Sequence, residues 1–171
     1  MPKAPAKKSA RTVAKLIAKP ATRVAAKPTI HLIKLCVGVA TLEELEGYRE
    51  ERAHWWGADY GENVHVHRTR TRPKRADEIE GIGSIYWVIS GVIRCRQPIL
   101  RLTEAIDENG MACCDIIMAP DMVRTVPRPK SAFQGWRYIE PKDAPPDLEK
   151  AGFDKDADPK IAEELMRLGL I

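Results

Sequence analysis

Two glycine-containing dipeptides fix the centre of this chain as a set of antiparallel strands. Ser90-Gly91 separates two runs rich in β-branched residues, 84–89 and 92–102, and Asn109-Gly110 precedes a third run, 111–118. Such dipeptides adopt the positive φ angles of tight hairpin turns at little steric cost. The sequence therefore predicts a three-stranded antiparallel meander at the centre of the fold.

A strand and a helix are predicted before the meander. Residues 30–37 are mostly apolar and end at Gly38, as expected of a buried strand. Thr41 and Glu44 have the spacing of a capping box, which marks the start of a helix. Gly57 has the residue type that commonly follows a helix, so we expect the helix to end there.

The rest of the chain is predicted to add one more strand, an irregular segment and a short helix. Residues 62–72 alternate as in a strand, whereas the repeated prolines after Pro120 predict extended or turn geometry. Asp158 followed by proline predicts a helix over 158–168, with an apolar stripe that docks on the sheet. Together these elements predict an α+β fold for residues 30–171, with an antiparallel curved sheet or partial β-barrel and flanking helices.

Charge is divided unevenly along the chain. The first 30 residues hold eight Lys and Arg and no acid, and their alanines and prolines predict a disordered basic tail over residues 1–29. The remaining 20 Lys and Arg face 24 Asp and Glu, a formal charge of −4, although the whole chain carries +4. The overall positive charge therefore argues that the tail binds nucleic acid. It argues the same for the domain only if the domain places its positive and negative side chains on different faces.

The cysteines and the lengths of the apolar runs indicate the cellular compartment to expect. Cys36, Cys95, Cys113 and Cys114 lack a C-x-x-C spacing and lie in apolar or β-like runs, so no disulfide framework is expected. No apolar stretch approaches the roughly 18 to 20 residues of a membrane-spanning helix. We therefore expect a cytoplasmic protein without a membrane partner. The acid-free tail would also suit an organellar transit peptide.

A cluster of cations lies within eight positions of the acidic domain. Alternation places its three arginines on one strand face, where guanidinium groups can bind phosphate oxygens in bidentate fashion. The alternative is ion pairing with nearby carboxylates, because surface runs of charge are usually only solvated. The cluster consists of Arg68, Arg70, Arg72, Lys74 and Arg75.

A second group of residues extends this candidate phosphate site. Arg94 and Arg96 are expected to project from one face of the neighbouring strand and to share a surface with the first cluster. Trp136, Arg137 and Tyr138 would supply stacking planes and a cation, as in proteins that bind single-stranded RNA. The alternative is that both aromatic rings plug the sheet.

Histidines are the main candidates for other chemistry. His65 and His67 lie two apart on a strand and share a face, a weak indication of a metal site because no third ligand is placed by spacing. His65, Thr69 and Asp115 are scattered polar residues from which a pocket enzyme could assemble a site. No linear motif for a nucleophilic hydrolase, phosphate loop, zinc protease or dinucleotide is present, so no cofactor is expected.

Several strings of residues, taken in order, resemble a bacterial family of unknown function, DUF1489. The resemblance covers about residues 30 to 148 and implies a cytoplasmic protein with no assigned activity and no catalytic residues to carry over. The hairpin 83–102, which follows a helix and a basic strand, is also similar in architecture to small PUA and ASCH barrels, which bind RNA or modified nucleotides. The strings that carry the family resemblance are 31–38, 73–76, 84–89, 94–99 and 133–138.

The preferred prediction is a small module that binds RNA or a nucleotide through an arginine-rich sheet face, with the tail adding nonspecific affinity. One alternative is a pocket enzyme acting on a nucleotide or another small anion, in which a histidine moves a proton. Another is an interaction or assembly factor, in which Trp55, Trp56 and the C-terminal helix contact a protein partner.

Overall fold

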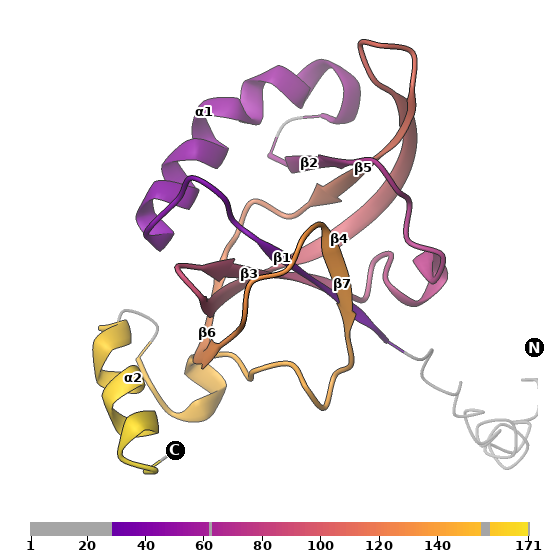
Figure 1. Cartoon of the computed structure of the whole chain (residues 1–171). Coiled ribbons are helices and arrows are strands. Elements are labelled where there is room, and N and C mark those ends of the chain that lie inside the picture. The colour runs from indigo at the N-terminus through magenta and orange to yellow at the C-terminus, as the bar shows by residue number, and fades with distance from the viewer. Residues whose placement is uncertain (1–28, 62, 155–157, 171) are drawn as a thin grey trace, which may run out of the picture.

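In the computed structural model, which describes residues 29–61, 63–154 and 158–170, a curved seven-stranded sheet is flanked by helices (Figure 1). The α+β prediction is confirmed. The predicted basic tail falls almost wholly on residues 1–28 and so lies outside the described residues.

The strands lie in the order β2-β5-β4-β3-β1-β7, and β6 pairs with β4 off this path. All neighbouring pairs are antiparallel except β1 and β3, which run parallel and depart from the predicted antiparallel sheet. The strand bounds are β1 His31–Leu35, β2 His65–Thr69, β3 Ser84–Ile89, β4 Val92–Ile106, β5 Ala112–Met118, β6 Val123–Pro129 and β7 Trp136–Ile139.

The long strand β4 joins the two halves of the sheet. Its first half pairs with β3 and β6, and its second half pairs with β5, which in turn pairs with β2. Register shifts interrupt its ladders around Arg94 and again between Ile99 and Arg101. Such irregularities bend a strand and increase its twist. β2 and β7, the two ends of the strand order, both contribute residues to one cleft.

The predicted meander and both of its turns are confirmed. Ser90 and Gly91 have φ angles of 50° and 78°, the left-handed pair that a two-residue hairpin requires. In the second turn Gly110 has φ 76°, and the Asp107 carboxylate accepts hydrogen bonds from the backbone N–H groups of Asn109 and Met111. β3, β4 and β5 therefore follow one another as antiparallel neighbours.

The helix α1, Leu42–Tyr60, begins as predicted and ends later than predicted. The Thr41 hydroxyl accepts from the Glu44 backbone N–H at its start. Gly57 lies inside the helix, and Gly61, with φ 88°, is the glycine that follows the last turn. The extra turn carries Tyr60, whose hydroxyl donates to the buried Asp115 on β5, and this contact ties the helix end to the sheet.

The irregular segment predicted after Pro120 instead contains two strands, β6 and β7. β6 pairs with β4 and also forms an isolated bridge from Thr125 to Asp147; Pro127 lies within the register shift between β4 and β6, where a missing N–H group is tolerated. β7 pairs with β1 from His31 to Lys34. These pairings place the segment before β7 beside the sheet.

The C-terminal helix α2, Pro159–Arg167, lies beside β6, at the lower left of Figure 1. The predicted apolar stripe of Ile161, Leu165 and Leu168 is only partly covered: Leu165 is partly buried, whereas Ile161 and Leu168 are 55% and 56% exposed. Short 3₁₀ turns, Ala76–Glu78 and Glu149–Ala151, complete the described elements.

A smaller buried cluster, which includes Ile33, Tyr86 and Val88, lies on one face of the sheet. The main core lies between the other face and the first half of α1. Trp87 on β3 is its largest fully buried side chain. The Trp87 indole Nε1 donates to the Gln97 amide oxygen, and the Gln97 Nε2 lies 2.9 Å from His65 Nδ1. This buried polar chain holds β2, β3 and β4 in one arrangement.

Candidate functional site

A cleft of about 760 Å³ lies between the end of β2 and the segment that leads into β7. We call it the β2–β7 cleft. Three of the predicted cations and one predicted aromatic residue line it, together with residues that the prediction missed. No Asp or Glu of the described chain is among the lining residues, which are Lys34, His67, Arg68, Thr69, Arg70, Thr71, Gln134, Gly135, Trp136 and Arg137.

Two arginines of the cleft keep charge that is not cancelled by neighbouring carboxylates. Arg70 is exposed in the bend after β2 and forms no ion pair with any described carboxylate. The Arg137 Nη1 donates to the backbone carbonyl oxygens of Gln134 and Trp136, at 2.9 and 3.1 Å. Those bonds orient the guanidinium without neutralising it, so both groups remain available to an anion.

Arg68 contributes less charge, because Asp115 neutralises it. Its Nε and Nη2 each donate to a carboxylate oxygen of Asp115 at 2.7 Å, and Asp115 is fully buried. Burial acts to raise the pKa of Asp115, but the hydrogen bonds from Arg68 and Tyr60 outweigh it and hold the pKa below its ordinary value. Arg68 is therefore a fixed structural arginine at the floor of the cleft.

Trp136 provides the aromatic wall of the cleft. Its ring stands edge-on to Tyr138 at 5.2 Å between centroids, and its Nε1 donates to the Thr71 carbonyl oxygen at 3.3 Å. These contacts link β7 to the bend after β2. Trp136 is partly buried against the core and also lines the cleft, so its position agrees with either of the two predicted alternatives.

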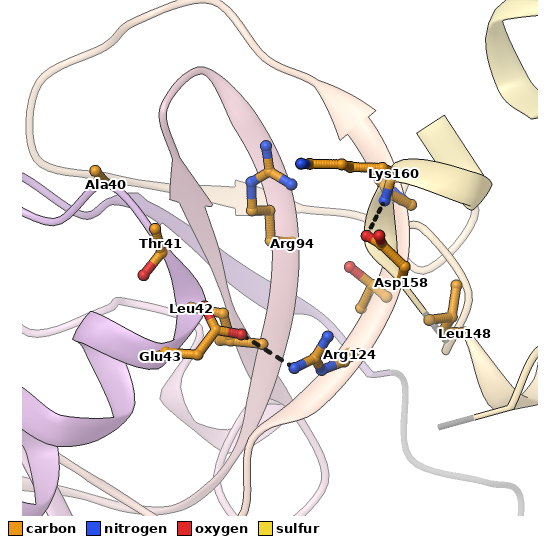
Figure 2. Close-up of a pocket in the computed structure, with 11 residues that line it drawn as sticks. Ala40, Thr41, Leu42, Glu43, Arg94, Arg124, Leu148, Asp158 and Lys160 are labelled. Atoms are coloured by element: carbon orange, nitrogen blue, oxygen red, sulfur yellow. Dashed lines mark hydrogen bonds and ion pairs between the residues drawn. The ribbon is translucent and has the colours of Figure 1, made fainter. Parts of the chain in front are cut away.

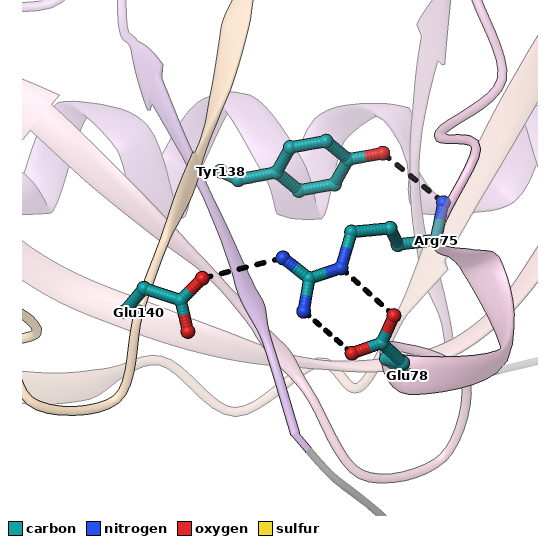
Figure 3. Close-up of polar contacts among 4 residues, drawn as sticks. All are labelled: Arg75, Glu78, Tyr138 and Glu140. Carbon is teal, nitrogen blue, oxygen red and sulfur yellow. Dashed lines mark hydrogen bonds and ion pairs between the residues drawn. The ribbon is translucent and has the colours of Figure 1, made fainter.

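Arg75 and Tyr138 belong to a separate polar network (Figure 3). Two guanidinium nitrogens of Arg75 donate to Glu78 at 2.6 and 2.8 Å, and a third donates to Glu140 at 3.2 Å. The Tyr138 hydroxyl accepts from the Arg75 backbone N–H. Here the alternative of ion pairing with nearby acids describes the observed contacts.

The other two members of the first cluster also lie apart from the β2–β7 cleft. Arg72 lies 3.8 Å from Glu80 and 4.0 Å from Glu104, and it lines a neighbouring hollow of about 450 Å³ with Arg70. Lys74 is exposed in the turn before the first 3₁₀ segment. The single arginine face expected over Arg68, Arg70 and Arg72 is thus divided, because β2 ends at Thr69 and strand alternation ends with it.

Arg94 and Arg96 are not brought into this cleft, contrary to the prediction of one shared surface. Arg94 sits at the register shift of β4 and lines a hollow of about 330 Å³ near the start of α1 and α2, with Glu43, Arg124 and Lys160 (Figure 2). Arg96 instead binds the Asp147 carboxylate through two hydrogen bonds. The register shift breaks the alternation on which the prediction depended.

His65 and His67 both contact buried residues of the central strands. His65 is held by Gln97, and His67 stands edge-on to Trp87 at 5.7 Å between centroids. No group of three or more His, Cys, Asp or Glu in the described part of the chain is placed to hold a metal ion. Asp115 pairs with Arg68, whereas His65 and Thr69 face the other side of β2, so these three side chains do not form one site.

Lys34 is the cleft residue that sequence reasoning missed most clearly. It lies on β1 opposite Trp136 of β7, between the apolar residues Ile33 and Leu35. Burial lowers its pKa from the ordinary lysine value. A lone lysine inside an apolar run is the signal that could have indicated it, but only the β1–β7 pairing shows which site it faces.

Comparison with known proteins places the chain in a family. A family model described as "Protein of unknown function (DUF1489)" matches residues 32–171, a range that includes α2 and so extends beyond the stretch that carries the resemblance noted above. No curated protein and no solved structure matches. Within the described residues, no helix has the length and apolar character needed to cross a bilayer. Because the match covers most of its length, the chain belongs to the DUF1489 family.

Proposed function

We propose that this protein binds RNA or a nucleotide in the β2–β7 cleft. The observation that carries the proposal is the cleft's composition: Lys34, Arg70 and Arg137 line it together with Trp136, and no acid of the described residues lines it. Cations that track phosphates beside a stacking plane are the recurring arrangement in proteins that bind single-stranded nucleic acid. The concentration of cations is informative because the chain from residue 31 onward carries a net negative charge.

The enzyme alternative is favoured by one feature and disfavoured by another. His67 lines the same cleft as Arg68 and Arg70, which is the placement that a proton-transferring histidine beside a phosphate would need. However, burial together with the charges of Arg49 and Lys34 lowers the pKa of His67 to about 3. An imidazole with that pKa is neutral and weakly basic near neutral pH, so binding is the better-supported function.

The test is RNA binding by the full chain with Arg70→Ala. Truncation removes one guanidinium that no described carboxylate neutralises, so we expect affinity for a single-stranded oligonucleotide to fall about tenfold. Fluorescence anisotropy at low salt measures it. Arg101→Ala is the matched control, because Arg101 is also exposed but lies on β4 outside the cleft.

Three outcomes are informative. A loss with Arg70→Ala and unchanged binding with Arg101→Ala supports the cleft. Equal losses in both variants point to nonspecific attraction by any exposed cation, and no loss in either removes the proposal.

A further inference from the structure

A second concavity adjoins the β2–β7 cleft. It has a volume of about 250 Å³ and lies between α1 and β2, and we call it the α1–β2 cleft. His67 and Arg68 line both concavities, so the two meet at β2. No carboxylate of the described chain lines the second concavity either. Its lining residues are Tyr48, Arg49, Arg52, Ala53, Trp55, Trp56, His65, Val66, His67 and Arg68.

An exposed stack of side chains forms the outer wall of the α1–β2 cleft. The Arg52 guanidinium carbon lies 4.0 Å from the Tyr48 ring centroid and 4.8 Å from the ring of Trp55. The three residues recur at helical spacing and therefore share one face of α1. Tyr48 is 40% exposed and Trp55 is 58% exposed, so large aromatic surfaces stay in water on a helix whose buried residues lie on another face.

The junction between the two clefts is held rigidly. The Arg68 guanidinium carbon lies 5.1 Å from the Trp56 ring, and Trp56 in turn lies 6.1 Å from Tyr60. The bidentate contact with Asp115 fixes the same guanidinium from the other side. A ligand crossing β2 would therefore meet a preorganised surface, which lowers the entropic cost of binding.

We infer that the ligand is a single-stranded oligonucleotide that lies across β2, with bases against Trp136 at one end and against the Tyr48–Arg52–Trp55 stack at the other. This inference rests on the proposed function. A single nucleotide can occupy only one of the two aromatic sites, and the bases of a duplex are paired and inaccessible for stacking. The two-part surface therefore selects an extended strand.

The distribution of charge indicates that the β2–β7 cleft and the Tyr48–Arg52–Trp55 stack contact different parts of the strand. Glu51 and Asp59 neighbour the stack on α1, so this end offers little net attraction to phosphate. Base stacking on an aromatic ring is sequence-tolerant and contributes about 1 to 3 kcal/mol per base. The β2–β7 cleft thus supplies phosphate contacts, and the α1 stack supplies base contacts.

The experiment compares single-stranded RNA of increasing length, from one nucleotide to about 4, 8 and 16 nucleotides, with full-length wild-type protein and Trp55→Ala. Fluorescence anisotropy gives the affinities. We expect wild-type affinity to rise with length beyond that of the mononucleotide, and Trp55→Ala to lose about fivefold or more for the longer strands only. Leu100→Ala is the control, because Leu100 is 47% exposed on β4, outside both clefts.

The results that would reject this inference differ from those that would reject the proposed function. If Trp55→Ala binds every length as wild type does while Arg70→Ala binds weakly, the cleft stands and the extended track is wrong. If no length binds, both proposals fail. If the protein self-associates and Trp55→Ala abolishes the association in sedimentation, the α1 stack is an interface between copies, and the inference is overturned.

Discussion

Asp147 is a residue whose ionisation should affect stability in acid. Its carboxylate accepts from Arg96 at 2.6 and 2.9 Å and lies 2.9 Å from Lys150 Nζ, and the hydrogen bonds from Arg96 lower its pKa to about 2. The folded state therefore takes up a proton at lower pH than the unfolded chain. We expect this group to add about 2 kcal/mol of unfolding free energy above about pH 4, which disappears as pH falls toward 2.

Urea unfolding at a series of acidic pH values measures this effect. Asp147→Asn cannot ionise, so its unfolding free energy should be lower near neutral pH and should depend less on pH between about 4 and 2. Equal pH dependence in the variant and the wild type would show that Asp147 is not the group responsible.

For single residues, the sequence indicated which side chains could bind an anion better than it indicated where those side chains lie. Arg68, Arg70, Trp136 and Arg137 were indicated by residue type and do line one cleft. Which arginines are neutralised by a carboxylate was not predictable from the sequence. Arg68, for example, pairs with Asp115, which lies 47 residues away along the chain. Contacts between segments distant in sequence decide which arginines are neutralised.

Gly83 lies where the backbone before β3 passes close to the backbone of Ile30 and Ile79. A Cβ at this position would lie 2.6 Å from the Ile30 carbonyl oxygen and 3.0 Å from that of Ile79, at the start of β3. We expect Gly83→Ala to lower the unfolding free energy by about 1 to 3 kcal/mol in urea denaturation. Gly47→Ala is the control, since Gly47 lies inside α1 with open space around it and should stabilise the helix by about 0.4 to 1 kcal/mol. Unchanged stability in Gly83→Ala would mean that the chain around residue 30 moves away without cost.

At the scale of elements, local signals predicted the meander and the start of α1 because turn dipeptides and capping residues act over a few positions. The same local reasoning missed β6 and β7, since proline disfavours a strand only where its N–H is needed. It also missed the parallel pairing of β1 with β3, which no local pattern encodes. The β2–β7 cleft exists because of these non-local pairings, so its shape was not predictable from the chain alone.

The whole molecule divides its charge between the basic stretch of residues 1–30 and a domain that gathers uncancelled cations in one cleft. If both parts contact a polyanion, each releases counterions and adds to the salt dependence of binding. We expect the cleft to bind RNA even without help from the basic stretch. The likeness to PUA and ASCH barrels remains a prediction, and binding in the cleft does not depend on it.

The most direct measurement is a salt titration of RNA binding by full-length protein in which the eight Lys and Arg of the first 30 residues are replaced by Gln. We expect this protein to bind a single-stranded oligonucleotide at low salt, with a log–log slope shallower than wild type by about 0.7 for each phosphate that the replaced cations neutralise in the wild type. Adding Arg70→Ala should then weaken the remaining binding about tenfold. Complete loss of binding at low salt in the Gln-substituted protein would show that the cleft does not bind RNA by itself, because affinity would then come from the basic stretch alone.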